Sequence, residues 1–77
     1  MPNPSNGEFF LNYQLEGKND MTISVMDALG RLVFEQELTS ADGGMLNLPL
    51  QNHADGVYYA RIKYGSKIAV KKLVIQH

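Results

Sequence analysis

The sequence predicts an all-β protein, a sandwich of about six to seven short antiparallel strands. Three observations lead to this class. Apolar and polar residues alternate with a period of two in several segments, which is the pattern of half-buried strands. Polar segments containing Gly, Asn and Asp separate them at regular intervals, as turns do. No segment has the apolar period of a helix of useful length.

The first two strands are expected at residues 8–15 and 21–26. The odd positions of both segments are apolar, which places them on one face of a strand. Residues 16–20 lie between the two segments and are polar with one glycine. We therefore expect a turn there.

A tight hairpin is expected between Asp27 and Gly30. The carboxylate of Asp27 can cap the turn, and Gly30 can adopt the positive φ that closes a bulged hairpin. The third strand is expected at residues 31–38. Its inward face is ambiguous, because Leu32 and Phe34 lie on the face opposite to Val33.

The next elements are a loop at residues 39–44 and a strand at residues 46–50. This strand contains Pro49, which cannot donate to a ladder, so we expect it at the edge of a sheet. A polar connector at residues 51–55 leads to the strongest strand, at residues 57–64. The turn Gly65-Ser66 joins that strand to the last one, at residues 67–76.

Composition limits the functional classes. The chain has 77 residues, of which 44% are hydrophobic and 19% charged, which fits one small globular domain. Its net charge of −1 argues against a dedicated nucleic-acid binder. There is no cysteine, which excludes disulfides and thiolate metal sites. The start of the chain has neither the basic residues nor the hydrophobic stretch of a secretory signal.

Charge divides the chain into two regions. Residues 1–55 have a local charge of −6, whereas residues 56–77 have a charge of +5 and no acidic residue. The last hairpin is therefore a basic element on an acidic body. Its lysines either protect an exposed sheet edge against aggregation or face a negatively charged or hydrogen-bonding partner.

Catalytic, metal and cofactor sites are not indicated. His53 and His77 lack metal-ligand spacing and are expected to be solvated. The serines have no histidine base in a known arrangement, and Gly43-Gly44 precedes a strand rather than a helix, unlike a phosphate loop. The aspartates suit turns, although a weak surface calcium site stays open. We expect a protein that is not an enzyme and holds no cofactor.

Three segments together resemble one family. They are Pro2-Asn3-Pro4-Ser5-Asn6-Gly7 before the first strand, residues 23–33 around the Asp27 turn, and Ala54-Asp55-Gly56-Val57-Tyr58 with the terminal Lys71-Lys72-Leu73-Val74-Ile75-Gln76. Their order and spacing resemble the type A C-terminal sorting domain of the type IX (Por) secretion system, over essentially the whole chain. The family often has an apolar residue where this chain has His53.

The resemblance implies an immunoglobulin-like β-sandwich that serves as a non-catalytic secretion signal. An outer-membrane translocon and a shuttle protein would read it, and a sortase-like peptidase would cut upstream of it on cell-surface attachment. Its route would be the periplasm in transit, then the cell surface or the extracellular space. Residues 1–77 would form one sorting domain, excised from a larger secreted protein, with residues 1–6 as a linker and motif.

The family motifs divide into two groups. A structural role is expected for the first group: Pro2, Asn3, Pro4, Gly30, Gly56 and Tyr58. Tyr58 is expected to pack its ring and satisfy its hydroxyl as a tyrosine corner does. Recognition by the translocon or shuttle is expected for the second group: Lys71, Lys72, Leu73, Val74, Ile75 and Gln76. A basic strand with two apolar faces suits docking by strand addition, and the alternative is an ordinary last strand in the core.

Two other functions stay open from the residues alone. A small adhesive or carbohydrate-binding module would need an aromatic platform, for which Tyr59 and Tyr64 are the candidates. An inert spacer would need no site at all. Self-association is also expected to be possible through an edge strand, either residues 46–50 or the terminal strand.

Overall fold

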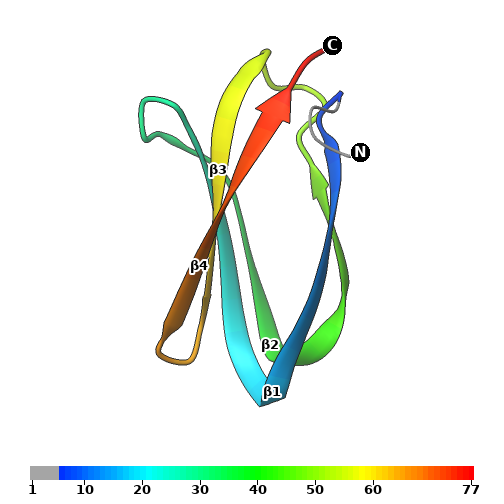
Figure 1. Cartoon of the computed structure of the whole chain (residues 1–77), viewed down its shortest axis with the longest axis vertical. Helices are drawn as coiled ribbons and strands as arrows, with labels where there is room; N and C mark the ends of the chain where they lie inside the picture. Colours follow the sequence, from blue (N-terminus) through cyan, green and yellow to red (C-terminus); the bar gives the residue numbers. More distant parts are fainter. Residues whose placement is uncertain (1–5) are drawn as a thin grey trace.

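The computed structural model describes residues 6–77, which form an antiparallel β-sheet (Figure 1). The sheet has the order β2-β1-β3-β4. Its strands are β1 (Glu8–Asp27), β2 (Leu32–Pro49), β3 (Gly56–Tyr64) and β4 (Lys67–Ile75). The all-β class is confirmed, but the count of six to seven strands is wrong for the described residues, which form four.

Two long strands account for the lower count. The expected turn at residues 16–20 lies inside β1, and the expected loop at residues 39–44 lies inside β2. Gln14 pairs with Gly43, and the next pair is Asn19 with Ala41. Residues 15–18 of β1 therefore oppose residue 42 of β2, and the register shifts again between Asn19 and Met21, so the ladder contains a large irregular bulge. Bulges bend a strand without ending it, so polar and glycine residues that suit turns bend these strands instead.

The bend turns the sheet back on itself. Figure 1 shows the first part of β1 and the last part of β2 rising along one side of the molecule, and the rest of the sheet rising along the other. We call residues 8–14 with 43–49 the short arm, and residues 19–27 and 32–41 with β3 and β4 the long arm. One bent sheet thus takes the place of the two separate sheets predicted.

The hydrophobic core lies between the two arms. Phe9 and Leu48 come from the short arm, and Ile23, Val25 and Ile62 come from the long arm; all belong to one buried cluster. The period-two prediction for the odd positions of residues 21–26 is confirmed, because Met21, Ile23 and Val25 are at most 1% exposed. Burying such side chains contributes about 1.5–3 kcal/mol each.

A bulge resolves the ambiguous face of the third predicted strand. Val25 pairs with Phe34 and Met26 pairs with Leu32, which leaves Val33 as an extra residue on β2. Cross-strand partners share a face, so Phe34 joins buried Val25 on the core side. Leu32 lies on the opposite face and is 57% exposed. Leu32 and Phe34, which a regular strand places on one face, thus lie on opposite faces.

The hairpin between β1 and β2 has the predicted chemistry. The Asp27 carboxylate accepts hydrogen bonds from the backbone N–H groups of Leu29 and Arg31, each at 2.9 Å, and pairs with the Arg31 Nε at 2.9 Å. Gly30 has φ of 85°, a conformation that costs other residues more. The hydrogen bonds from Arg31 and Leu29 lower the pKa of Asp27. The prediction for this turn is confirmed.

The edges of the sheet are β2 and β4. The prediction that Pro49 belongs to an edge strand is confirmed, since it is the last residue of β2 and pairs with Glu8. The side chains of Leu48 and Leu50 in the predicted segment 46–50 are buried. The other edge strand, β4, contains the predicted recognition residues.

Candidate recognition site on the terminal strand

The terminal strand β4 is paired with β3 along its length, from Lys67 opposite Tyr64 to Ile75 opposite Gly56. Its exposure changes along the strand. Residues 67–72 are exposed on both faces, Leu73 and Val74 are half-buried, and Ile75 is 1% exposed. We call residues 67–72 the open half of β4 and residues 73–75 its closed half.

The predicted recognition residues fall in both halves. Lys71 and Lys72 lie in the open half and are exposed, as is Gln76 just beyond the strand. Leu73, Val74 and Ile75 form the closed half. Ile75 belongs to the buried core and Leu73 packs against it. The Ile75 side chain therefore cannot touch a partner without leaving the core.

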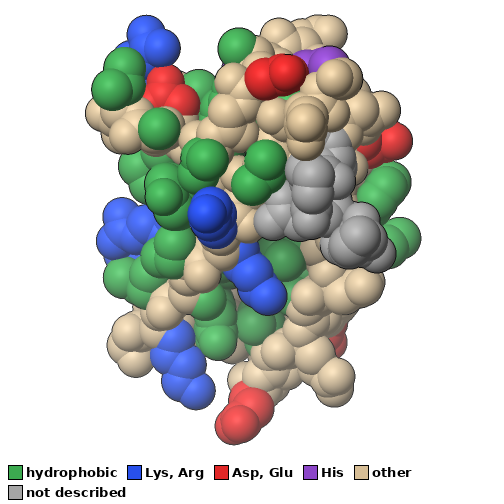
Figure 2. All heavy atoms as spheres, turned by 45° about the horizontal axis from the view of Figure 1, so that its top comes forward, with side chains coloured by type: hydrophobic (Ala, Val, Ile, Leu, Met, Phe, Trp, Pro, Cys, Tyr) green, Lys and Arg blue, Asp and Glu red, His purple; other side chains and the backbone are tan. Residues whose placement is uncertain are grey.

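The open half has two different faces. Cross-strand pairing places Ile68 beside Lys63 and Val70 beside Arg61, on the outer face of the sheet. Ile68 is 52% exposed and Val70 is 61% exposed. The core side of the open half carries Lys67, Ala69 and Lys71. These three residues are exposed, because no described part of the chain packs over them. Figure 2 shows Lys and Arg side chains among hydrophobic ones on the side that carries the β3–β4 hairpin.

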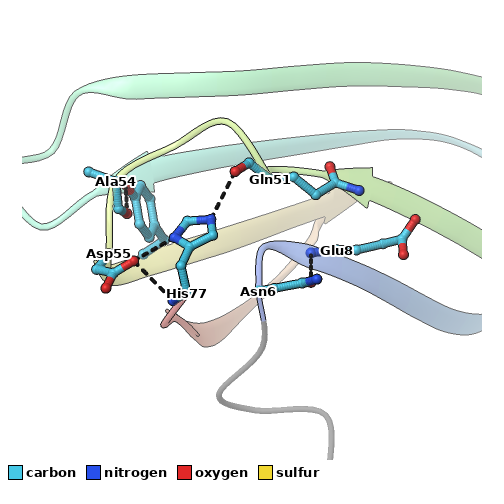
Figure 3. Close-up of polar contacts among 7 residues, drawn as sticks. Asn6, Glu8, Gln51, Ala54, Asp55 and His77 are labelled. Atoms are coloured by element: carbon cyan, nitrogen blue, oxygen red, sulfur yellow. Dashed lines mark hydrogen bonds and ion pairs between the residues drawn. The ribbon is translucent and has the colours of Figure 1, made fainter.

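The closed half is held by the last residue of the chain. The backbone N–H of His77 donates to the Asp55 carboxylate at 3.1 Å, and its ring Nδ1 lies 2.5 Å from the same oxygen. Its Nε2 lies 2.9 Å from the carbonyl oxygen of Gln51 (Figure 3). We call these three contacts the terminal clasp. His77 is exposed, as expected, but its ring also contacts the connector that precedes β3.

The terminal clasp shifts the pKa of both of its titratable side chains. The hydrogen bond with Asp55, followed by that with the Gln51 carbonyl, raises the pKa of His77 above its usual 6.5. The same side-chain contact, with the bond from the His77 N–H, lowers the pKa of Asp55 below its usual 3.8. The arrangement favours a protonated imidazole paired with a carboxylate.

Tyr58 contacts the same connector that the clasp contacts. The Tyr58 side chain is 6% exposed, and its hydroxyl donates to the carbonyl oxygen of Ala54 at 2.7 Å. The ring of His53 meets the ring of Tyr58 edge-on, with centroids 6.3 Å apart. His53 is half-buried beside Tyr58 in this contact. Gly56, which begins β3, has φ of 152°.

The start of the described chain lies beside this connector. Gly7 accepts a hydrogen bond from the Leu50 N–H at 2.8 Å. Its φ is 107°, and an added Cβ would lie 2.6 Å from the Leu50 carbonyl oxygen, so a side chain does not fit there. Asn6 accepts from the Glu8 N–H at 3.3 Å. Pro2, Asn3 and Pro4 of the predicted motif lie outside the described residues.

The aromatic platform required for carbohydrate binding does not form. Tyr59 pairs with Met26 and Lys72 on the outer face, where it is 40% exposed. Tyr64 pairs with buried Met21 and packs partly buried against the core. The two rings therefore lie on opposite faces of β3.

Two features of the site were missed from the sequence. Ile68 and Val70 had a usable signal, because they alternate with Lys67, Ala69 and Lys71. The clasp had none, since 22 residues separate Asp55 from His77. Within residues 6–77, no cluster of three or more His, Cys, Asp or Glu side chains is suited to a metal ion. In that same range no helix could cross a membrane.

Comparison with known proteins identifies the chain. Residues 1–76 match the family described as the secretion system C-terminal sorting domain. The chain belongs to this family. No curated protein and no solved structure matches it. The sequence-based identification is confirmed: the sorting domain is a C-terminal signal for type IX secretion.

Membership sets the general function of the sorting domain. The family is not catalytic, and its signal directs export across the outer membrane to the cell surface or the extracellular space. The domain therefore interacts with the secretion machinery.

Proposed function

We propose that the secretion machinery recognises the sorting domain through β4 and the residue after it. The observation that supports this is the position of the open half: it is exposed, basic and at a sheet edge. The β3–β4 turn also lies at the opposite end of the molecule from the start of β1 (Figure 1). A cargo that precedes the domain would leave that end accessible.

The predicted recognition residues take different roles in this proposal. Lys71, Lys72 and Gln76 are exposed and would reach the partner with their side chains, steering the encounter through charge. Leu73 and Ile75 would anchor the strand in the core, so that the open half keeps a fixed shape, and Val74 lies half-buried on the outer face. Gly30, Gly56 and Tyr58 would set the turns that hold β3 beside β4.

The partners in this proposal are the outer-membrane translocon and its shuttle protein. A sortase-like peptidase would cut upstream of the domain when the cargo is attached to the surface. The domain would fold during periplasmic transit, as an immunoglobulin-like unit whose two layers are the two arms of the bent sheet. Its compact form fits that role, because both arms share one core.

Reporter export tests the proposal. A secreted reporter fused to the sorting domain is compared with the same fusion carrying Lys71→Glu and Lys72→Glu. Both side chains are exposed, so the double variant should fold normally and lose most surface delivery. Lys18→Glu, at the bend of β1, is the matched charge control and should export normally. Unchanged delivery by the folded double variant would refute recognition through β4.

Truncation gives a second measurement. Removing residues 73–77 should also abolish export, but it deletes buried Ile75 and the terminal clasp. Folding of each variant is therefore checked by circular dichroism before export is scored. The charge variants then separate loss of recognition from loss of fold.

A further inference from the structure

We propose that residues 67–71 of β4 accept an extended strand of a partner protein whose sequence pattern is acidic-apolar-x-apolar-acidic. This inference rests on the proposed function and adds the chemistry of the partner. A complementary strand needs specified side chains at four of its five positions.

An added strand needs backbone N–H and C=O groups that point outward from the edge of β4. The two-residue turn Gly65-Ser66 makes Tyr64 and Lys67 the closing pair of the β3–β4 hairpin, which exchanges hydrogen bonds. Hydrogen-bonded and non-hydrogen-bonded pairs alternate along an antiparallel ladder. Ile68 and Val70 therefore direct their N–H and C=O groups away from β3. In residues 6–77 no strand lies beyond this part of β4.

The side chains then define what an added strand must carry. Ile68 and Val70 are more than half exposed on the outer face, so apolar side chains opposite them would bury both surfaces. Lys67 and Lys71 lie on the other face, four residues or about 13 Å apart. Within residues 6–77 neither has an ion-pair partner. Acidic side chains opposite these lysines would neutralise both charges.

Charge also selects between possible occupants. Residues 56–77 contain no acidic side chain, which favours an acidic partner. The only two acidic residues of this chain spaced by four are Glu16 and Asp20, and Gly17 and Asn19 stand between them where apolar residues are needed. A second copy thus lacks the pattern. An anionic lipid surface could neutralise the lysines, but it supplies no ladder for the backbone groups of Ile68 and Val70.

The pattern reads the same in both directions. A partner strand could therefore add in parallel or antiparallel orientation with the same side-chain matches. Discrimination would come from the two acidic positions, because like charges placed opposite one another destabilise a strand pair.

Peptide binding tests the inference directly. The isotopically labelled 77-residue chain is titrated with a peptide containing Asp-Val-Thr-Ile-Glu and with a control containing Lys-Val-Thr-Ile-Lys, and amide shifts are followed by NMR. We expect the acidic peptide to shift residues 67–71, to slow amide exchange at Ile68 and Val70, and to bind at least tenfold more tightly than the control.

Two variants make the test specific. Exchanging both lysines, Lys67→Glu with Lys71→Glu, should invert the preference, so that the basic peptide binds and the acidic one does not. Val70→Pro should abolish binding of both peptides. It removes an N–H that points to the open edge, and proline is tolerated in edge strands. A circular dichroism spectrum confirms that each variant is folded.

Other outcomes would overturn the inference. These are equal affinity for both peptides, shifts confined to another part of the domain, or concentration-dependent shifts at Ile68 and Val70 without peptide, which would indicate a second copy. Binding to phosphatidylglycerol–phosphatidylcholine vesicles in place of either peptide would indicate a lipid surface. If peptides fail while export still depends on Lys71 and Lys72, the inference falls alone. If the acidic peptide binds but the variants export normally, the proposed function falls.

Discussion

The two halves of β4 share β-branched aliphatic residues but lie in opposite environments. Each contains β-branched aliphatic residues, and both pair with β3. Ile75 in the closed half is 1% exposed, whereas Ile68 in the open half is 52% exposed. The difference arises from what lies over each half: the connector and the clasp cover one, and nothing in the described chain covers the other. The same residue type thus anchors the strand at one end and is available at the other.

The largest effect is expected from truncating the two isoleucines separately. Ile75→Ala should lower the free energy of unfolding by about 2–5 kcal/mol, because it leaves a cavity in the core. Ile68→Ala should change it by no more than about 0.5 kcal/mol, since the side chain is largely in water. Urea unfolding of both variants measures the difference. Equal losses would show that the two halves do not differ in packing.

A smaller effect is expected at the connector that covers the closed half. Tyr58→Phe keeps the ring but removes the hydroxyl that donates to the Ala54 carbonyl oxygen. The expected loss is about 1 kcal/mol in unfolding free energy. Tyr59→Phe, on the outer face of the same strand, is the matched control and should leave stability unchanged. Urea midpoints of the two variants provide the comparison.

The terminal clasp should make the closed half sensitive to pH. The raised pKa of His77 means that its stabilisation is complete below about pH 6.5 and fades as pH rises through its folded pKa. The lowered pKa of Asp55 means that its stabilisation is present above about pH 3.8 and fades as pH falls through its folded pKa. The clasp is therefore strongest between these limits.

Hydrogen exchange of β4 amides measures this dependence. After correction for the intrinsic rate, opening at Ile75 should become easier between pH 6 and pH 8.5, while opening at Ala69, which pairs with Ile62, stays unchanged. His77→Ala should remove the pH dependence at Ile75. If protection at Ile75 stays constant over this range in the unmodified chain, the imidazole contact does not hold the strand.

The smallest effect on stability is expected in the open half. Lys67→Glu and Lys71→Glu should together shift the unfolding free energy by no more than about 0.5 kcal/mol, because both side chains are exposed. Thermal unfolding in low salt is the measurement. A large loss would mean that these lysines stabilise the fold, and their charge would then need no partner to explain it.

Local patterns were sufficient for much of the fold. The alternation at Met21, Ile23 and Val25 identified a buried face, and Asp27 with Gly30 identified the hairpin, because these features depend on neighbouring residues. The basic last hairpin was also evident from charge alone. These predictions required no knowledge of which strand lies beside which.

The bends could not be predicted, because they depend on register. Gly17 and Asn19 suit a turn and an irregular bulge equally well, and the choice is made by the pairs that Gln14 and Asn19 form with β2. The clasp between Asp55 and His77 joins distant residues for the same reason. β4 divides into two halves because other segments of the chain pack over only one of them. The alternation of apolar and polar residues within the strand does not encode those contacts.

The placement of both described ends of the chain at one end of the molecule has a mechanical consequence. The short arm pairs Glu8 with Pro49 through Gln14 with Gly43, and these hydrogen bonds run perpendicular to the strands. If the machinery holds the β3–β4 tip and the cargo pulls at the start of the domain, the load passes along β1 to its bend, where Met21 pairs with Tyr64 beside the tip. The β1–β3 ladder is then loaded from this one end, and the pair Met21–Tyr64 bears the force before the pairs farther along.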